Sequence, residues 1–226
     1  MVVRRSGITV VGGGGGALGS AVVSRLVAAG RRVVIPTRHP GRAEPGPGIT
    51  EIECDLDDLG SVARLRTAVE AMGPWVGAVS ASGGFAGGRA HEVDDSAIEE
   101  QIAANLLGPW RLARAAAASM VAGGAGGRIV VVASRASVEV ARGQAAYQVS
   151  KAAVLRLVQV MAVELEGHGI TVNAVLPGTM DTLANRTSMP KANRSAWVST
   201  DAVAAVIEWL LSDTAAAVTG GAIPAG

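Results

Sequence analysis

The sequence has one cysteine, one tyrosine, one phenylalanine and two lysines among its 226 residues. A single cysteine, Cys54, excludes an internal disulfide and favours a reducing compartment, so we expect a cytoplasmic protein. The formal net charge of +1 leaves no footprint for nucleic acid. No apolar run approaches the roughly 18 residues that a membrane-spanning helix needs. The three histidines lack metal-ligand spacing, so we expect no metal site. From the charge and the short apolar runs, we also expect no nucleic-acid or membrane partner.

Short stretches rich in alanine and valine alternate with helical patterns along the whole chain. The mean hydropathy of +0.36 fits parallel strands buried on both faces. The pattern predicts helices over 17–29, 58–72, 145–166 and 200–212, and two helices over 94–121 broken near Gly108-Pro109. It predicts strands over 8–11, 32–35, 49–54, 76–79, 128–133, 170–176 and 218–223. This alternation is typical of an α/β fold, with residues 1–226 forming one domain around a doubly wound parallel sheet.

A run of glycines, Gly12 to Gly16, joins the first predicted strand to the first predicted helix, and Gly19 follows within that helix. Glycine lets the backbone turn sharply and approach a pyrophosphate, which then binds the free N–H groups at the helix amino terminus. Because the run lies between a strand and a helix, we interpret it as a dinucleotide-binding loop rather than as a flexible turn.

The only tyrosine, Tyr147, lies four residues before Lys151, and Ser134 lies thirteen residues before Tyr147. Residues four apart share one face of a helix, so the phenol and the ammonium would be neighbours. A free phenol has a pKa near 10, and a nearby ammonium favours the phenolate, which brings general acid–base catalysis closer to neutral pH. A serine hydroxyl beside them would hold a substrate oxygen.

With these motifs in order, the chain resembles the classical short-chain dehydrogenase/reductase family over its whole length. The matching positions are the glycine loop, Asp55, Gly83, Asn105, Ser134, the run Tyr147 to Lys151, and the run Val172 to Gly178 that leads to Thr182. The resemblance implies a Rossmann fold with strand order 3-2-1-4-5-6-7, a nicotinamide cofactor, and oxidoreductase activity on a carbonyl or alcohol substrate.

The resemblance also implies a role for each matching residue. Tyr147 would be the acid/base, Lys151 would lower its pKa and hold the ribose, Ser134 would polarise the carbonyl, and Asn105 would position a water. Thr182 would contact the nicotinamide carboxamide or the pyrophosphate. The cofactor-binding positions expected on these grounds, together with the residue at the end of the second strand, are Gly13, Gly16, Ala17, Leu18, Gly19, Arg38, Asp55, Leu56, Ser82, Gly83, Tyr147, Lys151, Pro177, Gly178 and Thr182.

Two details bear on the substrate and on the folding of the loop. The run Gly83 to Gly88 is similar to the dihydropteridine reductase branch, but that branch generally lacks the serine that this chain keeps as Ser134. We therefore favour carbonyl or alcohol chemistry over pterin reduction, which stays an alternative, as does a non-catalytic dinucleotide sensor. The threonine that usually opens the glycine loop is Gly12, so the turn would be braced differently.

The end of the second predicted strand decides the cofactor. A carboxylate there binds the ribose 2′-hydroxyl of NAD, but the chain has Thr37 at that position and Arg38 next to it. Arginine pairs with a phosphate through charged hydrogen bonds, so we predict NADP, with NAD as the alternative. The family's two long central helices form a dimer interface, so a homodimer or homotetramer is implied.

Overall fold

The computed structural model describes residues 7–41 and 46–226. Seven parallel strands form one sheet in the order β3-β2-β1-β4-β5-β6-β7, which confirms the predicted fold class and strand order. The strands are β1 Ile8–Gly12, β2 Arg32–Thr37, β3 Ile49–Glu53, β4 Trp75–Ser80, β5 Gly127–Val132, β6 Ile170–Pro177 and β7 Ala222–Ala225. The helices are α1 Ala17–Ala28, α2 Leu59–Met72, α3 Asp95–Ile102, α4 Gly108–Gly123, α5 Ala145–Glu164, α6 Leu183–Ser188 and α7 Thr200–Leu210.

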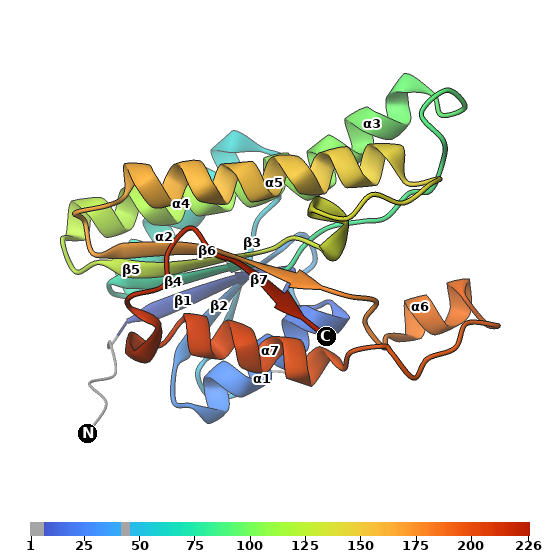
Figure 1. Cartoon of the computed structure of the whole chain (residues 1–226). Helices are drawn as coiled ribbons and strands as arrows, with labels where there is room; N and C mark the ends of the chain where they lie inside the picture. Colours follow the sequence, from blue (N-terminus) through green and yellow to red (C-terminus); the bar gives the residue numbers. More distant parts are fainter. Residues whose placement is uncertain (1–6, 42–45) are drawn as a thin grey trace.

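Helices cover both faces of the sheet (Figure 1). One apolar core lies between the sheet and α2, α4 and α5, and includes Leu65, Leu112 and Val158, all fully buried. The second core lies on the opposite face, under α1 and α7, and includes Leu26 and Ile207. Central strands such as β1 and β5 are buried at every position, which explains why they are mostly apolar rather than alternating, with Thr9 and Arg128 as the polar exceptions. Within the described residues, no helix has the length and hydropathy to cross a bilayer.

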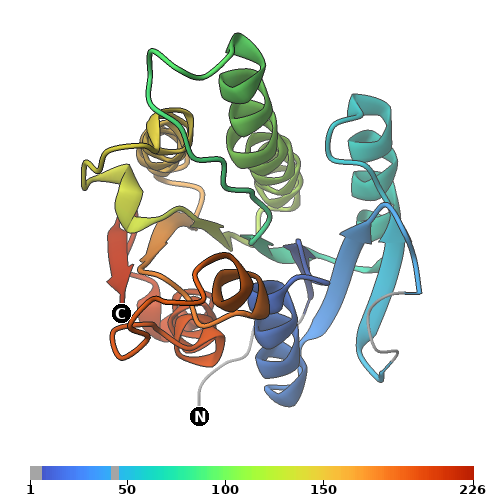
Figure 2. The same cartoon turned by 90° about the vertical axis from the view of Figure 1, so that its right-hand side faces the viewer.

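The strand order reverses at β1, which pairs with β2 on one side and with β4 on the other. In such sheets the crevice at the carboxyl ends of the strands beside the reversal is the usual place for a ligand. The segments that follow β4, β5 and β6 all gather at this end, together with α6 (Figure 2).

The predicted junction of two helices near Gly108-Pro109 agrees with the start of α4 at Gly108, since proline is tolerated in a first helical turn. What was not predicted is the π-helical turn that residues Ala103–Leu107 form just before it. One predicted element is wrong in detail. The last strand begins at Ala222 rather than at 218, because the Val218 N–H turns back to the Ala215 carbonyl and the Thr219 hydroxyl accepts the Val172 N–H.

Candidate active site

The turn from β1 into α1 leaves no room for side chains at Gly13, in the loop, and at Gly19, in the first turn of the helix. Gly13 has φ +77°, and a Cβ there would lie 2.7 Å from the Ser82 nitrogen. A Cβ on Gly19 would lie 2.0 Å from the Gly13 carbonyl oxygen. The Gly16 N–H donates to that same carbonyl at 2.9 Å and closes the turn. The turn is therefore packed tightly on itself and against the segment after β4, the compact geometry that a dinucleotide-binding glycine turn needs.

Helix α1 begins at Ala17, and the preceding residue, Gly16, provides no side-chain cap. Its first N–H groups are therefore available to an anion, and they carry the positive end of the helix dipole. Ala17 is exposed at this end, whereas Leu18 and Gly19 are buried in the core. A threonine at position 12 would have to displace the Leu112 side chain, because a Cβ there would lie 2.7 Å from Leu112 Cδ2.

A groove of about 530 Å³ runs from this loop along the carboxyl ends of β2, β3 and β4. Its lining includes seven of the predicted cofactor-binding residues: Gly13, Gly16, Arg38, Asp55, Leu56, Ser82 and Gly83. The groove suits a dinucleotide because its lining joins the glycine turn, an arginine at one end and small residues at the other. The described residues therefore fit a nicotinamide dinucleotide.

One end of the groove carries charges of both signs. Arg38 and His39 follow β2, and Glu51 of β3 lines the same end. Thr37 is the last residue of β2, the position where an NAD-binding protein would have a carboxylate. The Thr37 hydroxyl accepts the His39 N–H at 3.2 Å. The Glu51 carboxylate accepts the Gly41 N–H and so fixes the start of the loop between β2 and β3.

Ser134 and Tyr147 meet at the carboxyl end of β5. Ser134 lies just beyond the strand, and its side chain is close enough to the Tyr147 phenol to favour the ionised form of that phenol. The Ser134 hydroxyl also accepts the Ala136 N–H at 3.2 Å, which orients it at the start of a short 3₁₀ turn. Burial raises the pKa of the Tyr147 phenol above its ordinary value, and the Ser134 side chain opposes that rise.

Lys151 is 5% exposed and lies one turn further along α5. Its ammonium donates to the Val132 carbonyl at 3.1 Å and lies 6.0 Å from the centre of the Tyr147 ring. Burial lowers the pKa of Lys151 to about 8. The sequence predicts that Lys151 lowers the pKa of Tyr147, but in this structure burial dominates and the phenol pKa moves the other way.

Asn105 is fully buried within the π-helical turn, and both polar atoms of its side chain are hydrogen-bonded. Its Oδ1 accepts the Gly84 N–H at 2.9 Å, and its Nδ2 donates to the Gly84 carbonyl, Gln101 Oε1 and Ser150 Oγ, each at 3.0 Å. Single π-helical turns inside helices frequently occur at functional sites. Here the turn brings Asn105 to the loop after β4.

Gly83 connects the groove to this cluster. A Cβ at position 83 would lie 2.6 Å from Asn105 Oδ1 and 3.2 Å from Lys151 Nζ. The structure thus brings Asn105, Lys151, Tyr147 and Ser134 together beside the small-residue end of the groove. All four predicted catalytic residues lie at one place, although they come from three separate segments of the chain: the π-helical turn, the end of β5 and helix α5.

The remaining predicted residues follow β6 and lie outside the groove lining. Pro177 is the last residue of β6, and the Gly178 N–H donates to the Ala225 carbonyl at 3.1 Å. The Thr182 hydroxyl accepts the Asn185 N–H at 3.2 Å and so caps α6. In this structure Thr182 has a structural role, and its contact with a cofactor stays a prediction.

Two partners of the catalytic residues were not predicted. Gln101 Oε1 and Ser150 Oγ both accept hydrogen bonds from the Asn105 amide nitrogen, and the Ser150 hydroxyl also donates to the Tyr147 carbonyl at 2.7 Å. Gln101 is one helical turn before Asn105, a spacing that would have pointed to it. Among the described residues, no group of histidine, cysteine and acidic side chains could hold a metal.

Several known proteins are similar to this chain in both sequence and fold. The short chain dehydrogenase family model matches residues 7–193. The 3-oxoacyl-[acyl-carrier-protein] reductase MabA of Mycobacterium tuberculosis is 33% identical over 224 residues, covering 95% of this chain and 89% of that protein. A short-chain type dehydrogenase/reductase from Mycobacterium ulcerans superposes with a TM-score of 0.90 at 30% identity, covering 99% and 89% of the two chains.

A third similar protein was solved with a nicotinamide cofactor. A variant of actinorhodin polyketide ketoreductase with NADPH superposes with a TM-score of 0.88 at 27% identity, covering 99% of this chain and 97% of that one. The family match spans the glycine loop, Asn105, Ser134, Tyr147 and Lys151.

Proposed function

This chain belongs to the short-chain dehydrogenase family, and from that premise we propose that it transfers hydride between a nicotinamide cofactor and a carbonyl or alcohol carbon. The observation that carries the proposal is that Ser134, Tyr147 and Lys151 lie together, beside the end of a groove that suits a dinucleotide. A protein that only binds dinucleotide has no need for such a cluster. Oxidoreductase activity is common to the reductases and dehydrogenases that it resembles.

The bound cofactor would supply or accept the hydride. For reduction, the Tyr147 hydroxyl gives its proton to the substrate oxygen, and for oxidation the phenolate takes the proton back. Ser134, which lies beside the phenol, would hold and polarise the same oxygen. The Lys151 ammonium holds the ribose and favours the phenolate electrostatically. Asn105 keeps the loop after β4 in place through Gly84, and it would also position a water for proton return.

Carbonyl or alcohol chemistry is the form of the activity that we favour, and Ser134 is the reason. Its side chain lies beside the phenol, where the hydroxyl would bind a carbonyl oxygen. Pterin reduction remains the alternative, because the run Gly83 to Gly88 resembles that branch. Turnover of both nicotinamide cofactors with a panel of ketones, quinones and quinonoid pterins separates the two. If no compound of the panel supports oxidation of the cofactor, the result would favour the dinucleotide sensor.

We further propose NADP(H) as the preferred cofactor, with Arg38 holding its 2′-phosphate. Charge-assisted hydrogen bonds contribute about 1.5–3 kcal/mol, or roughly 10- to 150-fold in affinity. Arg38→Ala should therefore weaken NADP(H) binding by roughly that factor and leave NAD(H) binding nearly unchanged, as measured by nucleotide titration. Arg66→Ala, in an exposed ion pair with Glu70 on α2, is the matched control.

The position of Glu51 at this end of the groove favours the alternative, NAD(H), because its carboxylate would repel a 2′-phosphate. Equal affinity of the wild-type protein for the two cofactors would reject the preference. An unchanged ratio of affinities in Arg38→Ala would reject the role of Arg38.

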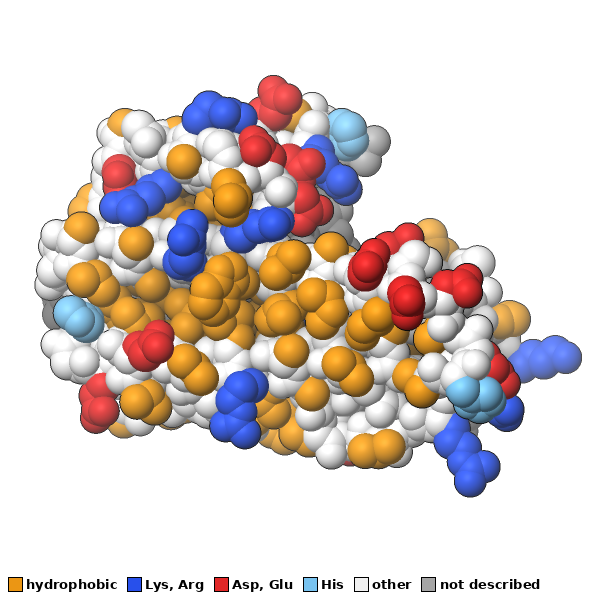
Figure 3. Space-filling view, turned by 90° about the horizontal axis from the view of Figure 1, so that it is seen from above, with side chains coloured by type: hydrophobic (Ala, Val, Ile, Leu, Met, Phe, Trp, Pro, Cys, Tyr) orange, Lys and Arg blue, Asp and Glu red, His pale blue; other side chains and the backbone are white. Residues whose placement is uncertain are grey.

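The chain is proposed to form dimers through α4 and α5. A largely apolar groove of about 520 Å³ lies between these helices, and its lining includes Trp110, Ala118, Val121 and Leu165. Apolar side chains gather on this face of the molecule (Figure 3). Exposed patches of this kind mark interaction sites. Within the dimeric particle each groove would face the partner's, and two such dimers would give the tetramer.

Ala118→Glu should convert the particle to a monomer in analytical ultracentrifugation. Ala118 is exposed in the groove, so the new carboxylate is tolerated in the monomer but would be buried without a partner in the dimer. Ala63→Glu, at an exposed position of α2, is the control. A wild-type protein that sediments as a monomer would reject the interface.

The cytoplasm is the proposed location, given the single cysteine, and cell fractionation tests it.

A further inference from the structure

The only phenylalanine of the chain contacts its only tyrosine. The ring of Phe85 meets that of Tyr147 edge-to-face, with 5.1 Å between the ring centres and 71° between the ring planes. This is a geometry that aromatic pairs prefer. Even so, Phe85 remains 63% exposed. A large apolar ring therefore lies against the proposed acid/base while most of its surface faces solvent.

The backbone on both sides of Phe85 is fixed. The residue before it, Gly84, is bonded through both its N–H and its carbonyl to the buried Asn105 side chain. Three residues after it, the Gly88 N–H donates to the Gly143 carbonyl at 2.8 Å, and the Gly88 carbonyl accepts the Ala145 N–H at 3.1 Å. Gly88 thus bridges to the segment that leads into α5. Phe85 is held between two anchors, so its exposure does not result from a loose loop.

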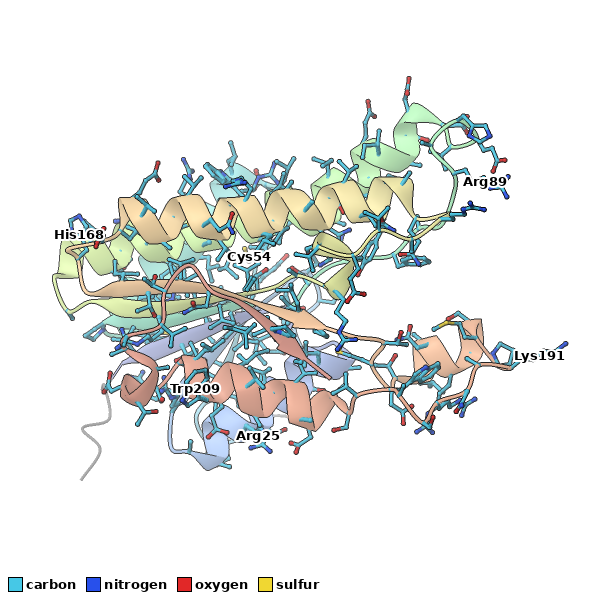
Figure 4. The ribbon with its side chains drawn as sticks, in the orientation of Figure 1. Arg25, Cys54, Arg89, His168, Lys191 and Trp209 are labelled. Atoms are coloured by element: carbon cyan, nitrogen blue, oxygen red, sulfur yellow. The ribbon has the colours of Figure 1, made fainter. Side chains whose placement is uncertain are left out.

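Other exposed apolar side chains lie on the segments that leave this end of the sheet. Val138 and Val140 follow β5, and they are 60% and 95% exposed. Leu183 and Met189 follow β6, and they are 81% and 38% exposed. The loop with Arg89 and the tip with Lys191 bound this end from above and below, with α6 close to the lower one (Figure 4). Apolar surface thus gathers where a substrate would reach Tyr147.

We infer that Phe85 positions the substrate, and that the site takes carbonyl compounds with an aryl or extended alkyl group on the carbonyl carbon. The inference rests on the proposed function. The apolar group would lie against the exposed part of the Phe85 ring while the carbonyl oxygen reaches the Ser134 and Tyr147 hydroxyls. Small polar ketones would gain nothing from this contact. Phe85 acts through contact with the substrate and takes no part in proton transfer.

The test compares acetophenone with dihydroxyacetone as substrates of wild type, Phe85→Ala and Phe85→Trp. Phe85→Ala should raise the KM for acetophenone by at least about tenfold, the effect of losing an apolar contact of this size. Its kcat/KM for dihydroxyacetone should change by less than about threefold by the same reasoning. Phe85→Trp, which keeps an aromatic surface, should restore the acetophenone KM. Trp209→Ala, which removes an exposed aromatic ring from α7, is the control.

A purely structural role for Phe85 predicts a different result. If the ring only shields Tyr147, Phe85→Ala would change both substrates by the same factor, and that outcome overturns the inference. Wild-type preference for dihydroxyacetone would also overturn it. Failure of the proposed function is a separate result, since wild type would then reduce no ketone with either cofactor. Saturation-transfer NMR of acetophenone binding would still test the contact, with signal expected for wild type and lost in Phe85→Ala.

Discussion

Replacing Tyr147 with phenylalanine is expected to lower turnover by at least ~10²-fold while cofactor affinity stays close to that of the wild type. The ring remains, so its packing against Phe85 and its place on α5 are preserved. What disappears is the hydroxyl that Ser134 contacts, and with it the proton donor at the substrate oxygen. General acid–base catalysis contributes about 10²–10⁴-fold, and no other tyrosine in the chain can replace this one.

The measurement is single-turnover reduction of a ketone, with nucleotide binding and thermal unfolding followed on the same samples. Thr67→Val removes a hydroxyl on α2 that bonds only to its own helix, at Ala63, and should leave all three quantities unchanged. A Tyr147→Phe protein that keeps more than a tenth of the wild-type rate would contradict the assignment of Tyr147. A large loss of cofactor affinity would instead show that the hydroxyl mainly binds the cofactor.

Replacing Lys151 with methionine should weaken cofactor binding and turnover but make the cofactor-free protein more stable. Burial lowers the pKa of Lys151 to about 8, which means that the fold disfavours the ammonium. At about 1.4 kcal/mol per pKa unit the cost is roughly 3 kcal/mol, and the lost hydrogen bond to Val132 offsets about 1 kcal/mol of the gain. We therefore expect a gain of roughly 2 kcal/mol in the free energy of unfolding at neutral pH.

The pH dependence follows from the direction of the shift. Between about pH 8 and the ordinary lysine pKa of 10.5, the unfolded chain binds the proton that the folded chain has released. The burial cost is therefore complete below pH 8 and disappears as the pH approaches 10.5. The extra stability of Lys151→Met should be largest at neutral pH and shrink at high pH. The pH at which oxidation reaches half its plateau should rise, because the ammonium no longer favours the phenolate.

Chemical denaturation at pH 7 and pH 10, nucleotide titration and pH–rate profiles check these expectations. Lys191, the only other lysine, is exposed, so Lys191→Met is the matched control. Unchanged cofactor affinity together with an unchanged pH–rate profile would show that Lys151 has no part in catalysis. Loss of stability at neutral pH would show that the hydrogen bond to Val132 outweighs the burial cost.

Much of the fold and the site could be predicted because the signals are local. Strands that are buried on both faces are mostly apolar, and the glycine loop follows the first of them directly. The spacing from Tyr147 to Lys151 fits one turn of α5, and Ser134 comes just after β5. The order of these motifs along the chain then places them at one end of the sheet, since parallel strands share that end.

The features that the sequence could not reveal depend on contacts between distant segments. The π-helical turn at Ala103–Leu107 exists where Asn105 bonds to Gly84 and Ser150, and no local pattern encodes it. The start of β7 is set by the bonds of residues 219 and 220 to Val172, which lies on another strand. The direction of the Tyr147 pKa depends on burial, which follows from the packing of several elements around α5. Phe85 was recognisable only as part of a glycine-rich run until its contact with Tyr147 was known.

Transfer of deuterium tests the central claim most directly. Wild-type protein is incubated with a ketone and nicotinamide cofactor that carries deuterium at C4, and the alcohol is analysed by mass spectrometry and NMR. The account predicts one deuterium on the former carbonyl carbon, attached to one face only, and no such product with Tyr147→Phe on the same timescale. An alcohol without deuterium at that carbon, or no alcohol with either cofactor across the panel, would contradict it.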